Sequence, residues 1–207
     1  MTFDAQLTLR NHVDSVVRSC FVQLCQLRSV RRSLTDKALH TLIHAFIASH
    51  IDYCNALLCG VADGIIRRLE SVLHAAARLI TSIQRHEHIT PTLGDTLHWL
   101  PTSQRITFKI ALMMFDCSCG RCLKYFGDVF TPVHTIAAHL RLRSADHKDL
   151  VIPRVQSTRF GCRSFHVCGP TIWNKLPQDL RSTDTRKQFK CSLKRYTSVH
   201  MAGGMHV

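Results

Sequence analysis

The sequence predicts a mainly α-helical protein, a helical bundle followed by a small mixed α/β C-terminal module with a short β-hairpin. Apolar residues recur every three or four positions as far as residue 116, which is the period of an amphipathic helix. Beyond Gly120 the apolar runs shorten and gain strand character. The 207 residues are 45% hydrophobic and 20% charged, a composition that can bury a core and excludes disordered and collagen-like chains.

The helical part divides into four predicted helices. The first covers residues 13–27, and Thr35 is a typical N-cap for a second helix that continues through residue 47. The third, residues 65–83, has the clearest apolar spacing, and Pro91 and Gly94 then interrupt the pattern. A fourth helix is predicted over residues 103–116.

In the last third of the chain, the residue pattern predicts shorter elements. Residues 151–155 and 164–168 are predicted as strands joined by a turn that contains Gly161, and Gly169–Pro170 is predicted as a second turn. A final helix is expected after an N-cap at Thr183 or Thr185.

Charge is the most informative property of the composition. Lys and Arg number 27 against 14 Asp and Glu, which gives a net charge of +13. This imbalance suits a polyanionic partner and carries no information about the fold.

The sequence also bears on location. The first residues include Asp4 and Arg10 and have no apolar core of a secretory signal, and no apolar stretch is long enough to cross a bilayer. We therefore expect an intracellular protein, nuclear or cytoplasmic, that is neither secreted nor membrane-spanning, with its ten cysteines reduced.

An ordered set of short strings resembles the reverse transcriptases of non-LTR (LINE-type, jockey-like) retrotransposons. The strings cover nearly the whole chain, at spacings similar to those of the family, and the main ones are Thr2-Phe3-Asp4, Ile51-Asp-Tyr-Cys-Asn55, Ala75-Ala-Ala-Arg-Leu-Ile80, Leu97-His-Trp-Leu-Pro101, Arg163-Ser-Phe165, Gly169-Pro170, Trp173-Asn174 and Leu176-Pro177.

The resemblance implies only the region downstream of the polymerase palm. It implies that residues 1–12 are a remnant of the strand leaving the palm, residues 13–139 a helical thumb-like region, and residues 140–207 a basic C-terminal module. The family's RNA-directed DNA polymerase centre needs an Asp-Asp pair that binds two metal ions, and the sequence contains no such pair and no endonuclease. We therefore expect no enzymatic activity and no cofactor in this chain.

Two basic sets are candidate nucleic-acid contacts, and for each a solvated helix face is the alternative. In the third and fourth helices the candidates are Arg67, His74, Arg78, Arg105 and Lys109. In the last helix they are Arg186, Lys187, Lys190, Lys194 and Arg195. The expected ligand is RNA or an RNA–DNA template–primer duplex, bound through its backbone and without sequence specificity.

Two other functions remain open at this point. Cys119, Cys122, His134 and His139 nearly fit the spacing of a zinc finger, but Pro132 stands where the finger has a core Leu. Alternatively, the chain is an inert or protein-interaction remnant without nucleic-acid binding. The missing palm is an expected partner, and apolar faces such as Phe21/Leu24 that the palm would cover predict self-association.

Overall fold

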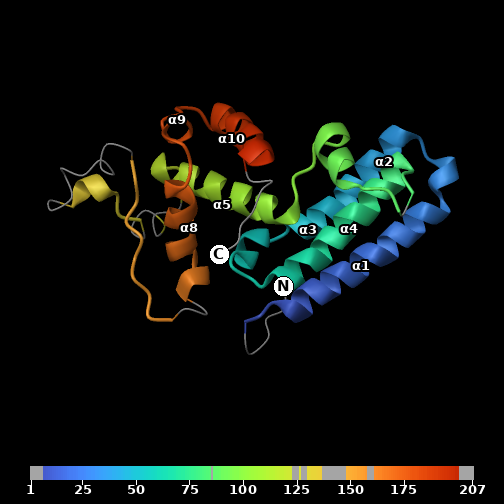
Figure 1. The fold of residues 1–207 in the computed structure, drawn as a ribbon, viewed down its shortest axis with the longest axis horizontal. Helices are drawn as coiled ribbons and strands as arrows, with labels where there is room; N and C mark the ends of the chain where they lie inside the picture. Colours follow the sequence, from blue (N-terminus) through green and yellow to red (C-terminus); the bar gives the residue numbers. More distant parts are fainter. Residues whose placement is uncertain are drawn as a thin grey trace. The chain divides into compact units, whose positions relative to one another are not determined.

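The computed structural model describes residues 7–84, 86–122, 126, 130–136, 148–157 and 161–200, of which 199 and 200 by backbone alone. The described chain is mainly helical, as predicted (Figure 1). It divides into two compact units, an N-terminal unit of residues 1–105 and a C-terminal unit of residues 106–207. The predicted limit at residues 12/13 lies within the first helix, and that at 139/140 lies outside the described residues.

Each predicted helix is present within a few residues of its expected limits. The helices of the N-terminal unit, in order, are α1 (Arg10–Ser29), η1 (Arg31–Ser33), α2 (Asp36–Ile43), η2 (His44–Ala48), α3 (Ser49–Asp52), η3 (Asn55–Leu58), α4 (Asp63–Thr81), η4 (Thr92–Thr96) and the first turn of α5 (Thr102–Ser118). Those of the C-terminal unit are the rest of α5, η5 (Val133–Thr135), η7 (Gly161–Arg163), α8 (Phe165–Asn174), α9 (Gln178–Arg181) and α10 (Arg186–His200).

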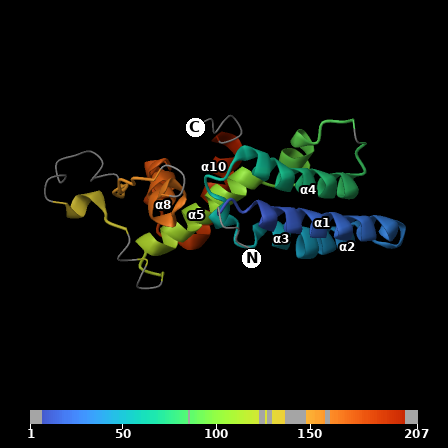
Figure 2. The ribbon, with the colours of Figure 1, turned by 90° about the horizontal axis from the view of Figure 1, so that it is seen from below.

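In the N-terminal unit, α1 and α4 lie side by side and run in the same direction, with α2, η2 and α3 returning beside them (Figures 1 and 2). The predicted Thr35 cap is confirmed, because its hydroxyl accepts from the Ala38 N–H at 3.2 Å. An ion pair between Asp14 of α1 and Arg68 of α4 joins the two parallel helices. The core of this unit is the apolar face of α4, formed by Ile65, Leu69, Val72, Leu73, Ala76 and Ala77.

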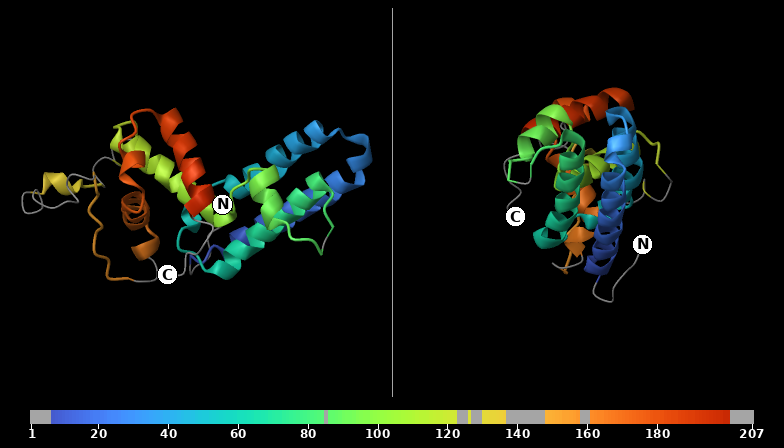
Figure 3. Two further views of the ribbon diagram at one scale, coloured as in Figure 1. Left: turned by 45° about the horizontal axis from the view of Figure 1, so that its top comes forward. Right: turned by 90° about the vertical axis from the view of Figure 1, so that its right-hand side faces the viewer.

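The C-terminal unit is organised around α5. Helix α10 lies beside α5 (Figure 3). Phe189 of α10 is fully buried and stacks on Phe115 of α5, with ring centroids 4.3 Å apart. Trp173 of α8 is 1% exposed, and its ring centroid lies 6.1 Å from that of Phe189. Of the two predicted caps, Thr185 precedes α10 and its hydroxyl accepts from the Gln188 N–H at 3.3 Å.

The predicted β-hairpin is wrong. Residues 151–155 form no strand. Of the second predicted strand, residues 165–168 form the first turn of helix α8. Within the described ranges, the only paired extended segment is a single antiparallel bridge between Pro132 and Leu150. The C-terminal unit is therefore helical where it is described, and its predicted mixed α/β character is not supported.

Side chains explain this departure from the prediction. Asn174 of α8 both donates to the Leu150 carbonyl at 2.8 Å and accepts from the Leu150 N–H at 2.9 Å. Its amide thus satisfies both backbone groups of Leu150, the residue just before the predicted strand. Pro153 cannot donate a ladder hydrogen bond.

The predicted turn at Gly169–Pro170 is also helical, since both residues lie inside α8. A Cβ atom at Gly169 would stand 2.6 Å from the Met114 sulfur of α5, so glycine allows α8 to approach α5 closely. Gly169 therefore serves the packing of α8 on α5 and does not form a turn.

The Phe115–Phe189 stack is expected to carry much of the stability of the C-terminal unit. We predict that Phe189→Ala lowers the free energy of unfolding by about 3–5 kcal/mol, because it leaves a cavity among buried rings. The neighbouring exposed Lys190→Ala should change it by less than about 0.5 kcal/mol. Urea denaturation of the full chain, followed by tryptophan fluorescence, measures both. Equal midpoints for the two variants would contradict the packing described here.

Candidate nucleic-acid interface

Among the described residues of the C-terminal unit, the exposed face of α10 is the most concentrated set of available cations. Phe189, Leu193 and Thr197 are buried on one side of this helix. The opposite side carries four exposed basic residues, for which the described residues contain no acidic partner: Lys187, Lys190, Lys194 and Arg195. Neighbouring side chains at this helical spacing have Cβ atoms about 5–6 Å apart, so the face can contact successive phosphates.

Arg186 at the start of α10 differs from the other four. Its Nε donates to both carboxylate oxygens of Asp116, at 2.9 and 3.0 Å. The guanidinium therefore joins α10 to α5 and is less available to a ligand. Lys109 of α5 is also exposed, and the described residues give its ammonium group no ion-pair partner.

The predicted stripe on α4 separates into residues with different surroundings. Arg67 is exposed, with no acidic partner among the described residues. His74 Nε2 instead lies 3.6 Å from Glu70 Oε1 on the next turn. Arg78 Nη2 donates to the Glu87 carbonyl at 3.3 Å. Of these three candidates, Arg67 is thus the one without an ion-pair or hydrogen-bond partner among the described residues.

Arg105 is held by internal contacts in the N-terminal unit. Its Nη1 donates to Asp52 Oδ2 at 2.8 Å, and its Nε donates to the Leu100 carbonyl at 2.9 Å. Its side chain is only 12% exposed. We therefore assign Arg105 a structural role and leave it out of the proposed interface.

Glu70 ties α4 to the first turn of α5. Its Oε2 accepts from the Thr102 N–H at 2.8 Å, which satisfies a backbone donor that has no partner within the helix itself. Burial alone would raise the pKa of Glu70, but the interactions with His74 and Thr102 outweigh it and hold the pKa below 4.5. The carboxylate is therefore charged at neutral pH.

Three further arginines come together with Arg78, and the spacing rules did not assign them a role. They line a groove of about 910 Å³ in the N-terminal unit, which we call the α1–α4 groove. Its lining residues are Phe21, Leu24, Cys25, Arg28, Arg31, Arg32, Ser71, Ala75, Arg78, Leu79, Ser82, Ile83 and Gln84. The only sequence signal was the cluster Arg28, Arg31 and Arg32 at the end of the first predicted helix.

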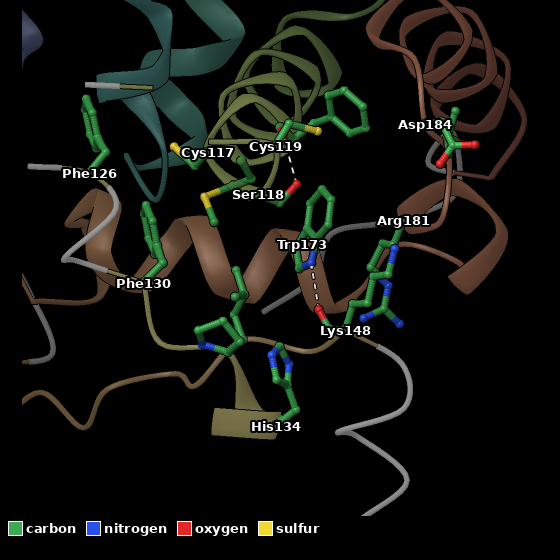
Figure 4. Close-up of a pocket in the computed structure, with 15 residues that line it drawn as sticks. Cys117, Ser118, Cys119, Phe126, Phe130, His134, Lys148, Trp173, Arg181 and Asp184 are labelled. Atoms are coloured by element: carbon green, nitrogen blue, oxygen red, sulfur yellow. Dashed lines mark hydrogen bonds between the residues drawn. The ribbon is translucent and has the colours of Figure 1, made fainter. Parts of the chain in front are cut away.

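A second pocket, of about 570 Å³, lies within the C-terminal unit (Figure 4). The Trp173 indole N–H donates to the Lys148 carbonyl at 3.1 Å beside it, and the aromatic rings of Phe126 and Phe130 line another side. Arg181 is 7% exposed and forms an ion pair with Asp149. This pairing neutralises the buried guanidinium, so the pocket has no strong preference for anions.

The same pocket contains thiols but no arrangement suited to nucleophilic catalysis. Cys117 and Cys119 lie on the far side of Trp173 from His134 (Figure 4). Burial, a hydrogen bond with Cys122 and the nearby Asp116 raise the pKa of Cys117 to about 12, so the thiol is protonated at neutral pH. A protonated thiol is a poor nucleophile and a poor metal ligand.

The zinc hypothesis gains no support from the described residues. They contain no group of three His, Cys, Asp or Glu side chains arranged to hold a metal ion, although Cys119, Cys122 and His134 are all among them. His139, the fourth predicted ligand, lies outside the described residues.

In comparisons with known proteins, no protein-family model, no curated protein and no solved structure matches the chain. Among the helices the structure describes, none is long and apolar enough to cross a lipid bilayer.

The Glu70 contacts predict a pH-dependent stability. Because the pKa of Glu70 is lower in the folded state than its ordinary 4.5, the carboxylate stabilises the fold above that pH, and this contribution is lost as the pH falls through the folded-state pKa. We expect Glu70→Gln to lower the free energy of unfolding by about 1–2 kcal/mol at pH 7 and by less at pH 3. Urea denaturation at the two pH values checks this, and an equal loss at both would argue against it.

The thiol environments predict selective alkylation. At pH 8 the exposed Cys119 should react readily with iodoacetamide, whereas Cys117, with a pKa of about 12, should react at least tenfold more slowly. Quenched time points analysed by peptide mass spectrometry give both rates. Similar rates for Cys117 and Cys119 would show that the environment of Cys117 differs from the one described.

Proposed function

We propose that this chain binds RNA or an RNA–DNA template–primer duplex without sequence specificity, as the non-catalytic C-terminal part of a non-LTR retrotransposon reverse transcriptase. One observation carries the proposal, namely the exposed face of α10 with Lys187, Lys190, Lys194 and Arg195. Lysine ammonium groups bind phosphates as point charges and do not distinguish bases, which favours backbone contact. Arg67 and Lys109 are secondary candidates.

The family assignment in this proposal rests on the ordered sequence strings given above. It adds the missing palm as the natural partner, and it includes a location inside the cell, in the nucleus or cytoplasm. The absence of an Asp-Asp pair from the sequence argues that this chain does not itself synthesise DNA.

The proposal predicts steeply salt-dependent binding. Fluorescence anisotropy with a labelled RNA–DNA hybrid should give a log–log slope of affinity against salt that corresponds to about four or more phosphates. The double variant Lys190→Glu/Lys194→Glu should weaken binding at least tenfold and lower the slope by about two, because two phosphate contacts are lost.

The control for this experiment has the same net charge. Arg10→Glu/Lys37→Glu changes two exposed cations of the N-terminal unit, far in sequence from α10. This control should keep most of the affinity and the slope. If the control loses as much affinity for the hybrid as the α10 variant does, binding depends on the total charge of the chain and not on the α10 face. Weak, salt-insensitive binding by the unmodified chain would leave an inert remnant as the correct description.

A further inference from the structure

The α1–α4 groove has an apolar floor. We use this name for four apolar side chains of its lining: Leu24 is 6% exposed, Leu79 and Ile83 are half-buried, and Phe21 remains 38% exposed. An aromatic ring left this accessible next to other apolar side chains is a common sign of a binding surface. A ligand that fits the groove therefore needs apolar groups of its own to cover this floor.

Basic side chains also line the groove. Among the residues that the structure describes, its lining includes Arg28, Arg31, Arg32 and Arg78 and no carboxylate. Since α1 and α4 are parallel, their C-terminal ends meet here, and a cation in each last turn offsets the partial negative charge of the helix end. Arg28 and Arg78 lie in these last turns and can serve that purpose, whereas Arg31 and Arg32 lie after the end of α1.

These arginines keep hydrogen-bonding capacity that the fold does not use. Arg31 pairs with Asp36 at 2.6 Å and Arg78 donates to Glu87, and the Nε atom of each is buried without a partner among the described residues. The donors that a ligand can reach are therefore mainly those of Arg28 and Arg32. Arg28 and Arg32 are exposed, and the described residues supply no carboxylate to either. Guanidinium groups with free donors favour carboxylate or phosphate ligands.

The geometry points to an acidic amphipathic helix of a partner protein as the occupant. Between Ser71 and Ser82 α4 rises roughly 16 Å, the length of about three helical turns. A helix with apolar residues at i, i+3, i+4 and i+7 would cover Phe21, Leu79 and Ile83, and its flanking Glu or Asp residues would face the arginines. A nucleic-acid strand would satisfy the arginines but leave the apolar floor uncovered, so the combination favours the peptide.

We therefore infer a protein-docking function for the N-terminal unit that is separate from the proposed α10 interface. Its test uses the full chain and a fluorescein-labelled 15-residue helical peptide with Leu at the four apolar positions and Glu at the flanking ones. Two control peptides replace every Glu by Lys, or every Leu by Ser. Only the peptide with both Leu and Glu should bind. A tenfold excess of unlabelled RNA–DNA hybrid should not displace it.

Two groove variants and one matched control assign the site. Arg28→Glu/Arg32→Glu and Phe21→Ser should each weaken peptide binding at least tenfold, with circular dichroism confirming that both variants fold. Arg10→Glu/Arg18→Glu changes two exposed arginines of α1 outside the groove and should bind as the unmodified chain does.

Three outcomes would overturn the inference. Equal binding of all three peptides would mean non-specific attraction. Loss of hybrid affinity in Arg28→Glu/Arg32→Glu, together with displacement of the peptide by the hybrid, would make the groove a nucleic-acid site. Sedimentation of the unmodified chain as a dimer that Phe21→Ser dissociates would make a second copy of this chain the occupant.

Discussion

Burial of the apolar face of α4 determines most of the N-terminal unit. Ile65, Leu69, Val72 and Ala76 recur at helical spacing, and hiding all four from water requires α1 and α2 to pack against the same side of the helix. The polar positions between them then point outward. Because α2, η2 and α3 return beside α1 before α4 begins, α4 runs parallel to α1, and the groove between them collects arginines from α1, η1 and α4.

The C-terminal unit obeys the same constraint with different side chains. The stack of Phe189 on Phe115 orients α10, and the buried edge through Leu193 and Thr197 leaves the lysines on the opposite side. In each unit the basic surface is thus a consequence of which apolar residues are buried. The two surfaces differ in kind, since the α10 face is purely cationic whereas the α1–α4 groove joins cations to an apolar floor.

The net charge of +13 does not by itself describe an interface. Arg105 and Arg181 are held by Asp52 and Asp149, and removing either carboxylate would leave a poorly solvated cation. The cations that can meet a ligand are the ones the fold leaves without such partners. This distinction between internal and available cations supports placing the proposed nucleic-acid contact on α10 and the proposed peptide contact in the groove.

The helices and the Thr35 cap could be predicted from the sequence, because apolar periodicity and a capping hydroxyl act over a few neighbouring residues. For the last helix the sequence left Thr183 and Thr185 open, and the structure shows Thr185 as the cap. The sequence also identified the basic face of α10, which lies within one helix. Contacts between distant segments decided the rest. Asn174 binds the backbone of Leu150, Gly169 lets α8 pack closely against Met114 of α5, and packing of α1 on α4 brings Arg28 and Arg32 to Arg78. Such contacts join residues with no shared local pattern, so only the tertiary structure reveals them.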